Sequence, residues 1–327
     1  MKLTETATAA KPVMIKPGAM QKVLAFASLI LLIVFFTVSS ENFFRFDNII
    51  GILLSTAVIG VLALGSTFVI ITGGIDLSVG TVMTFASVMT GVVITFWGLP
   101  IPFGIVGGIL TGALCGFISG WLVAKMNIPP FIATLGMMMV TKGLSLIVSG
   151  TKPIYFTDDH AKGFTQVAMA KLLGIPLAVY IFFGLAVIAS VILSKTIVGR
   201  YNFAIGSNEE ATRLSGVNTA YWKIVIYVIT GAFAGIAGIL MASRLNSAQP
   251  ALGAGYELEA IAAVVIGGTS LSGGRGSILG TVIGALIMSV LTNGLRILSV
   301  PQEWQIVLVG LVVILAVYAD ILRRRRK

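Results

Sequence analysis

Asp76 is the residue whose chemistry most needs an explanation, because it is a carboxylate inside an apolar stretch, VIITGGIDLSVGTVMT at residues 69–84. Facing lipid, such a charge would be very costly. Asp76 could cap the helix that we expect to begin near Leu77, by accepting hydrogen bonds from free amides at the positive end of the helix dipole. It could instead line a transport pathway with Ser78, or make a contact on the cytoplasmic side. The sequence leaves these three interpretations open.

The segment around Asp76 has a counterpart much later in the chain. GGIDLSVG at 73–80 and GGTSLSGG at 267–274 share the two leading glycines, the Leu-Ser pair and the final glycine, and each lies between two apolar runs. Paired glycines loosen a helix, and the backbone groups that they free must be satisfied by protein or by water in a cavity. Interrupted segments of this kind are typical of a transport pathway. The candidate pathway residues are Gly73, Gly74, Asp76, Ser78, Gly267, Gly268, Ser270 and Ser272.

Residues that could support catalysis are few. The only histidine, His160, lies in TDDHAKG beside Asp158 and Asp159, and such a polar loop is usually just solvated, so we expect neither a catalytic triad nor a metal site. A phosphate loop of the form G-x-x-x-x-G-K-[ST] is absent, and the nearest stretch, GGRGSILG, lacks the lysine. We therefore expect no enzyme, no bound cofactor and no ATP hydrolysis by this chain. The single cysteine, Cys115, is expected to serve packing.

The elements that must position these residues are membrane helices. Of the 327 residues, 57% are hydrophobic and 10% are charged, and the mean hydropathy is +1.03. A soluble domain cannot bury that much apolar surface, and several runs approach or reach the ~20 residues that a helix needs to cross hydrocarbon. We count ten runs: 23–40, 49–71, 79–98, 103–124, 131–149, 175–193, 224–242, a short one at 260–267, 278–298 and 304–322. The predicted fold class is all-α and integral to the membrane, with about ten transmembrane helices.

The positive charges predict how the chain is oriented. With ten alternating spans, fifteen of the 22 Lys and Arg residues fall on the side that holds both termini and six on the other, while Lys142 falls within a span. Basic segments stay in the cytoplasm. We therefore expect a cytoplasmic tail at 1–22, a transmembrane domain at 23–322 and a basic cytoplasmic tail at 323–327. Orientation and contact with anionic membrane lipid account for the net charge of +10, so we expect no nucleic-acid partner.

Two features inside the predicted spans concern packing. Glycine at every fourth residue lets another helix approach closely; the ladders are Gly104, Gly108, Gly112, Gly116 and Gly120, then Gly231 and Gly235, then Gly276, Gly280 and Gly284. We expect tight packing there, with sliding during a transport cycle as the alternative. We interpret Lys142 as snorkelling along its long stem, with an ion pair as the alternative.

The longest predicted cytoplasmic loop, 195–223, contains SNEEATRLSG, which can form a short surface helix with Ser207 or Asn208 as its cap. It is either a solvated amphipathic turn or a handle for a cytoplasmic partner. EATRLSG at 210–216 resembles the EAA-x-x-x-G coupling signature of ATP-binding-cassette (ABC) import permeases, departing in Thr212. GGIDLSVG, ATLGMMM, AIGSNEEATRLSGVN and NSAQPALGAGYELEAIAAVVIGGTSLSGGRGSILGT together resemble the ribose-type monosaccharide import permeases, over nearly the whole chain from about residue 40.

This resemblance implies a type II ABC importer permease of the bacterial inner membrane, working as a homodimer with the pathway between the two copies. It implies a cytoplasmic ATPase that uses ATP, a periplasmic or extracellular sugar-binding protein, and a monosaccharide substrate such as ribose. The permease would be a low-affinity channel, and most sugar selection would lie in the binding protein. The residues that would couple to the ATPase are Glu209, Glu210, Ala211, Arg213, Leu214 and Gly216.

An ion-coupled secondary transporter is the alternative function. It would use Asp76 as a proton or sodium site, but it gives the SNEEATRLSG segment no role. Uptake that persists when ATP is depleted, while the proton gradient is kept, would favour it.

Overall fold

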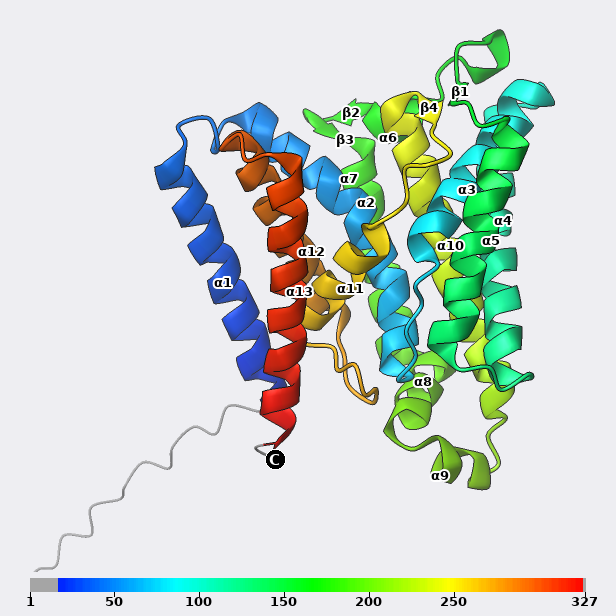
Figure 1. Ribbon diagram of the computed structural model, residues 1–327, viewed down its shortest axis with the longest axis vertical. Coiled ribbons are helices and arrows are strands. Elements are labelled where there is room, and N and C mark those ends of the chain that lie inside the picture. The colour runs from blue at the N-terminus through cyan, green and yellow to red at the C-terminus, as the bar shows by residue number, and fades with distance from the viewer. Residues whose placement is uncertain (1–16, 326–327) are drawn as a thin grey trace, which may run out of the picture.

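The computed structural model describes residues 17–325, and it is a bundle of helices (Figure 1). The helices are α1 (Pro17–Ser39), α2 (Phe46–Ile71), α3 (Val79–Gly91), η1 (Val92–Phe96), α4 (Ile101–Ala124), α5 (Pro130–Ser149), η2 (Asp159–Ala161), α6 (Gln166–Met169), α7 (Leu177–Lys195), α8 (Ile197–Ser207), α9 (Glu209–Leu214), α10 (Thr219–Leu245), α11 (Tyr256–Ile266), α12 (Ile278–Ile297) and α13 (Gln302–Arg325). In Figure 1, α1 and α13 stand at one side and α4 and α5 at the other, with α2, α10 and α11 between them.

Every predicted apolar run forms a helix. Within residues 17–325, seven helices are long and apolar enough to cross a membrane: α2, α3 continued by η1, α4, α5, α7, α10 and α12. Val23–Ser39 of α1 and Gln302–Tyr318 of α13 are shorter apolar stretches. α11 has only 11 residues, which at 1.5 Å per residue is a length of about 16 Å. The predicted number of ten spanning helices is therefore not confirmed.

The observed ends of α1 and α13 differ from the predicted boundaries of the two tails. α1 begins at Pro17, so residues 17–22 of the predicted N-terminal tail are helical, and residues 1–16 lie outside the described residues. α13 continues to Arg325, into the predicted basic tail, whose last two residues also lie outside the described part.

Four short strands lie at one end of the bundle, which we call the β1 end; α8 and α9 lie at the opposite end, the α8 end (Figure 1). β1 (Ile154–Tyr155) pairs antiparallel with β4 (Ser247–Ala248), and β2 (Lys171–Leu172) pairs antiparallel with β3 (Ile175–Pro176). The first pair ties the loop after α5 to the chain that leaves α10.

The chain is organised as two similar halves of opposite direction. In each half a long helix (α2 or α10) is followed by a non-helical stretch (72–78 or 246–255), a shorter helix (α3 or α11) and two more helices. α4 packs on α10 and α12 packs on α2, so the halves interlock. GGIDLSVG and GGTSLSGG nevertheless occupy different positions in their halves, because the first precedes α3 and the second follows α11.

The glycine ladders pack as predicted. A methyl group at Gly112 or Gly116 of α4 would overlap the α10 backbone at Gly231 or Tyr227, and Gly284 of α12 lies equally close to Ala263 of α11. Glycine at these positions lets the backbones touch, where van der Waals packing holds helices together. Cys115 is buried in the same region, as expected of a packing residue.

Candidate functional site

The two glycine motifs meet at the α8 end. The amide of Gly274 donates a hydrogen bond of 2.9 Å to the carbonyl of Ile71, the last residue of α2. Gly73, Gly273 and Gly274 have positive φ values of 83°, 82° and 71°, which L-residues with side chains rarely adopt. A methyl group at Gly206, near the end of α8, would overlap Ile71 and Gly274. We call Ile71, Gly73, Gly206, Gly273 and Gly274 the glycine junction.

Asp76 closes the turn before α3. Its Oδ1 accepts hydrogen bonds from the backbone amide of Ser78 at 2.8 Å and from the Ser78 hydroxyl at 2.6 Å. α3 begins at Val79, and its N-cap residue is Ser78. Asp76 is therefore not the cap itself; it lies two residues before the cap and supports it. Only 5% of Asp76 is exposed. The carboxylate therefore has a local hydrogen-bonding role, and its predicted part in the pathway stays a prediction.

Thr134 of α5 holds the strand-like segment around Asp76 from the other side. Its hydroxyl accepts from the amide of Leu77 at 3.1 Å and lies 3.2 Å from the carbonyl of Ile75. Sequence reasoning missed this residue, although ATLGMMM placed a buried hydroxyl in an apolar run.

α11 begins inside the bundle in the same way as α3, and Glu257 lies at its start. Both carboxylate oxygens of Glu257 lie 3.1 Å from the amide of Gly255, the N-cap residue, and only 8% of Glu257 is exposed. A methyl group at Gly80 of α3 would overlap Gly253 and this carboxylate. The starts of α3 and α11 thus meet, and each has its own carboxylate nearby. The sequence does not reveal Glu257, because the predicted apolar run begins only at residue 260, which puts this glutamate before the helix rather than in its first turn.

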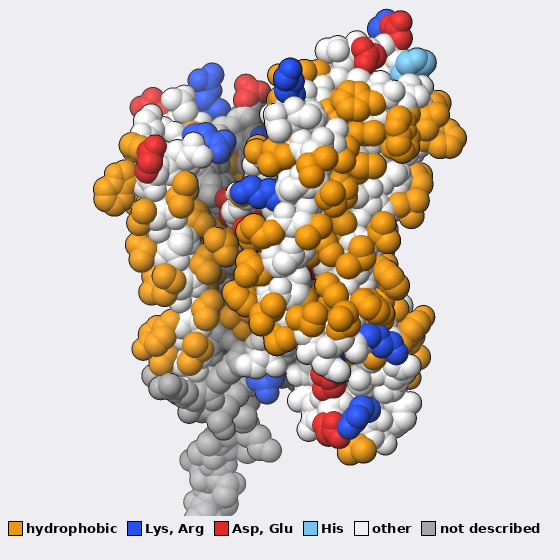
Figure 2. All heavy atoms as spheres, turned by 45° about the vertical axis from the view of Figure 1, so that its right-hand side comes forward, with side chains coloured by type: hydrophobic (Ala, Val, Ile, Leu, Met, Phe, Trp, Pro, Cys, Tyr) orange, Lys and Arg blue, Asp and Glu red, His pale blue; other side chains and the backbone are white. Residues whose placement is uncertain are grey.

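The candidate pathway residues differ in exposure. Gly73 and Ser272 are exposed, Gly268 and Ser270 are half-buried, and Gly74, Ser78 and Gly267 are buried within this single chain. Figure 2 shows a hollow between two groups of helices, with acidic and basic side chains inside it.

Lys142 is exposed on α5 and forms no ion pair with any residue that the structure describes.

An apolar groove lies on the surface formed by α4 and α5. Its volume is about 640 Å³, and its lining includes Phe85, Leu114, Ile118, Met137 and Val140. Its lining is almost entirely apolar and offers few polar atoms that could recognise a hydroxyl group.

The predicted surface helix is α9, and its predicted cap is confirmed. The side chain of Asn208 accepts a hydrogen bond of 2.9 Å from the amide of Ala211. The helix ends at Leu214, and Gly216, two residues later, has a φ of 85°, so this glycine serves the turn that follows α9. Thr212, where the coupling signature departs, is buried and donates to the carbonyl of Asn208 at 2.8 Å.

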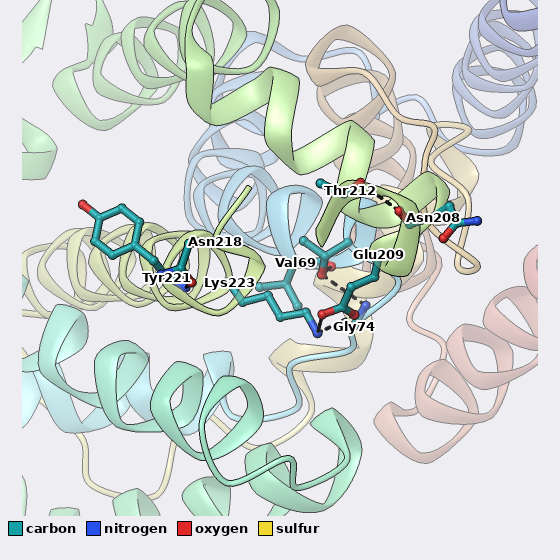
Figure 3. A network of polar contacts seen from close by, with 9 residues as sticks. Val69, Gly74, Asn208, Glu209, Thr212, Asn218, Tyr221 and Lys223 are labelled. Atoms are coloured by element: carbon teal, nitrogen blue, oxygen red, sulfur yellow. Dashed lines mark hydrogen bonds and ion pairs between the residues drawn. The ribbon is translucent and has the colours of Figure 1, made fainter. Parts of the chain in front are cut away.

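Two ion pairs fix the acidic residues of α9. Glu209 pairs with Lys223 of α10 at 2.6 Å, and Figure 3 shows the two side chains pointing toward each other from their helices. Glu210 pairs with Arg213 at 2.7 Å, and its hydrogen bond and charge raise the pKa of Arg213. Leu214 is 77% exposed beside them.

The polar loop at the β1 end holds no candidate metal centre. Asp159 pairs with Lys162 at 2.6 Å, and no group of three or more His, Cys, Asp or Glu residues that could hold a metal ion occurs within residues 17–325.

Comparisons with known proteins extend over almost the same residues as the fold. The family model described as "Branched-chain amino acid transport system / permease component" matches residues 48–317. The ribose import permease protein RbsC of Haemophilus influenzae is 41% identical over 297 residues, covering 90% of this chain and 92% of that protein. RbsC of Bacillus subtilis is 41% identical over 304 residues, covering 93% and 94%. The fructose import permease protein FrcC of Rhizobium meliloti is 37% identical over 294 residues, covering 88% and 82%. No solved structure matches this chain.

Proposed function

Because this chain belongs to the family of branched-chain amino acid transport system permease components, we propose that it is the membrane-spanning permease subunit of an ATP-driven monosaccharide importer. The observation that carries the proposal is its 41% identity, along 90% of the chain, to a ribose import permease. Ribose or a related sugar is the proposed cargo, and the bacterial inner membrane is the proposed location.

The starts of α3 and α11 support an uncharged cargo. Half-helices that begin inside a membrane protein often direct their positive ends at an anionic group of the substrate. In this chain the carboxylate of Asp76 accepts from the amide at the start of α3, and Glu257 lies against the amide at the start of α11. The positive ends of both helices are thus already paired with carboxylates of the chain itself. A sugar needs no such site, whereas an amino acid would bring a carboxylate of its own.

The exposed residues of α9 support an ATPase partner. Glu209, Glu210, Ala211, Arg213 and Leu214 form one short helix at the α8 end, which is the proposed cytoplasmic side. The chain's sequence has no phosphate loop, so another subunit must supply the ATP hydrolysis. The remaining proposed partners are a second permease copy, which completes the pathway, and an extracytoplasmic sugar-binding protein that selects the cargo.

Purified permease, reconstituted in vesicles with the ATPase and the sugar-binding protein encoded beside it, tests the proposal. We expect uptake of labelled ribose that requires ATP, and ATP hydrolysis that rises when the loaded binding protein is added. Collapse of the proton gradient with an ionophore should leave uptake intact. Uptake that instead follows the proton or sodium gradient without ATP would favour the ion-coupled alternative.

The orientation is tested with single cysteines in a Cys115→Ala background. Ser207→Cys at the α8 end and Thr157→Cys at the β1 end should react with an impermeant thiol reagent from opposite faces of the membrane. We expect Thr157→Cys to react in intact cells and Ser207→Cys only in inverted vesicles. Labelling of both from one face would contradict the proposed topology.

A further inference from the structure

α8 (Ile197–Ser207) connects the proposed ATPase contact to the interior of the bundle. Its last residue is followed directly by Asn208, the cap of α9, whose backbone carbonyl and side chain both bind groups within α9. A displacement of α9 by a bound partner must therefore move the end of α8.

The same end of α8 touches both glycine motifs. The backbone at Gly206 lies against the Ile71 carbonyl and the Gly274 amide, which are hydrogen-bonded to each other at 2.9 Å. A side-chain carbon at position 273 would lie 2.8 Å from the Gly206 carbonyl. No residue other than glycine fits position 206 in this arrangement. The end of α2, the turn after it and the turn before α12 are thus in contact with one point of α8.

Asn202 is a buried polar residue of α8 whose side chain has no hydrogen-bond partner in this arrangement of the described residues. Asn202 lies one turn before Gly206 on the same face of the helix, and it is 0% exposed. Neither its amide nitrogen nor its amide oxygen has a hydrogen-bond partner among residues 17–325. A buried amide without partners is costly, and it is retained where another state or function uses it.

We propose that α8 transmits movement of α9 to the two glycine turns, and that Gly206 and Asn202 are the positioning residues of this step. Gly206 keeps α8 in backbone contact with both turns, and Asn202 gains hydrogen bonds when α8 shifts in the transport cycle. This inference rests on the proposed function, because it requires an ATPase that moves α9. The two GGxxLSxG segments then act as one gate, opened from a single helix end.

Asn202→Leu separates this role from a structural one. Leucine removes both unpaired atoms at similar volume, so the melting temperature in detergent should rise, by about 2 °C. Transport per ATP hydrolysed should fall by about tenfold, within the range typical of coupling between sites. Ser289→Ala is the matched control, because its hydroxyl is also buried and without a partner, in α12. That variant should not lose transport.

Gly206→Ala tests the contact itself. We expect the variant to keep its ATPase and its ATP hydrolysis but to lose most sugar transport, whereas Gly184→Ala on α7, where a methyl group meets nothing within 4 Å, should transport normally. A fluorophore on Ser272→Cys, in the Cys115→Ala background, gives a readout independent of transport. Adding a non-hydrolysable ATP analogue to the complex with its ATPase should change the emission in the parent protein and leave it unchanged in Gly206→Ala.

These experiments distinguish an error in the role of α8 from an error in the proposed function. If the parent protein imports sugar with ATP, but Asn202→Leu and Gly206→Ala transport as efficiently per ATP as it does, the role of α8 is wrong and the proposed function stands. If the parent protein neither binds an ATPase nor responds to ATP, the proposed function is wrong and this inference fails with it. Uncoupled turnover in both variants, with the ATPase still bound, supports the inference.

Discussion

Glycine is abundant both in the contact between α4 and α10 and in the glycine junction, but its purpose differs. In α4, Gly112 and Gly116 are helical, and they lack a side chain so that two backbones can touch along several turns. In the junction, Gly73, Gly273 and Gly274 have positive φ, and they form turns that touch the end of one helix at Gly206. The first arrangement joins two helices along several turns, whereas the second joins two turns at one point, which our inference treats as the mobile contact. The residue type alone does not distinguish a fixed contact from a mobile one.

The largest effect should follow from filling the contact between α4 and α10. Gly116→Leu would place a side chain into the backbone of Tyr227, and we expect it to destabilise the protein by about 3 kcal/mol or more, because overpacking forces the helices apart. The measurement is the melting temperature in detergent and the amount of folded protein in the membrane. Gly143→Leu, at a position with nothing within 4 Å, is the control. Equal melting of the two variants would remove the distinction between the regions.

Changing the glycine turns should affect transport more than folding. Gly268, with φ of 92°, and Gly73, with φ of 83°, should each cost about 1–2 kcal/mol when replaced by valine. We expect both variants to reach the membrane and to lose at least about nine-tenths of sugar uptake, as coupling defects do. Gly268→Asn should retain more uptake than Gly268→Val, because asparagine tolerates this conformation. Normal uptake by both valine variants would show that the turns serve packing alone.

Substitutions on α9 should weaken binding of the ATPase without changing the contact between α4 and α10. Leu214→Asp puts a charge on the exposed face of α9, and co-purified ATPase should fall by about tenfold, as for an interface residue worth somewhat more than 1 kcal/mol. Glu210→Arg should weaken the complex by repulsion or by loss of a partner charge. Leu173→Asp is the control, because Leu173 is 90% exposed at the opposite end. The melting temperature should not change in any of the three, and full retention of the ATPase by Leu214→Asp would contradict the assignment of α9.

The smallest effect is expected at the start of α11. Glu257→Gln keeps an acceptor for the Gly255 amide but removes the negative charge, so stability should fall by about 0.5–1 kcal/mol. Sugar uptake should persist and become sensitive to small carboxylic acids such as acetate. Glu303→Gln, at the exposed start of α13, is the control. Resistance of the Glu257 variant to carboxylic acids would argue that the helix starts do not face the cargo.

Local patterns in the sequence were sufficient for some of these features. Glycines at every fourth position predict a close helix contact because one face of a helix repeats at that spacing, and the ladder on α4 packs accordingly. Asn208 before two glutamates predicted a helix cap, because a cap depends only on the next three residues. For the same reason the helices themselves could be predicted, with boundaries a few residues in error.

Features that depend on distant residues could not be predicted. Gly274 bonds to Ile71 across about two hundred positions of sequence, and the likeness between the two glycine motifs did not show that they touch. The structure places them at different points of the two halves and in contact with each other. Their likeness reflects a shared need for tight turns. Thr134 escaped notice because its partner, the amide of Leu77, is 57 residues away in the sequence.

The brevity of α11 has a consequence for how the protein is made. With 11 residues, this segment covers about half of the ~30 Å hydrocarbon thickness, so it cannot enter the lipid phase by itself during synthesis. Its insertion therefore requires α12, which packs against it through Gly284, to have emerged from the ribosome. The two segments would then insert together as a hairpin. The biogenesis of the second half therefore depends on the apolarity of α12, and polar substitutions there should strand α11 outside the membrane.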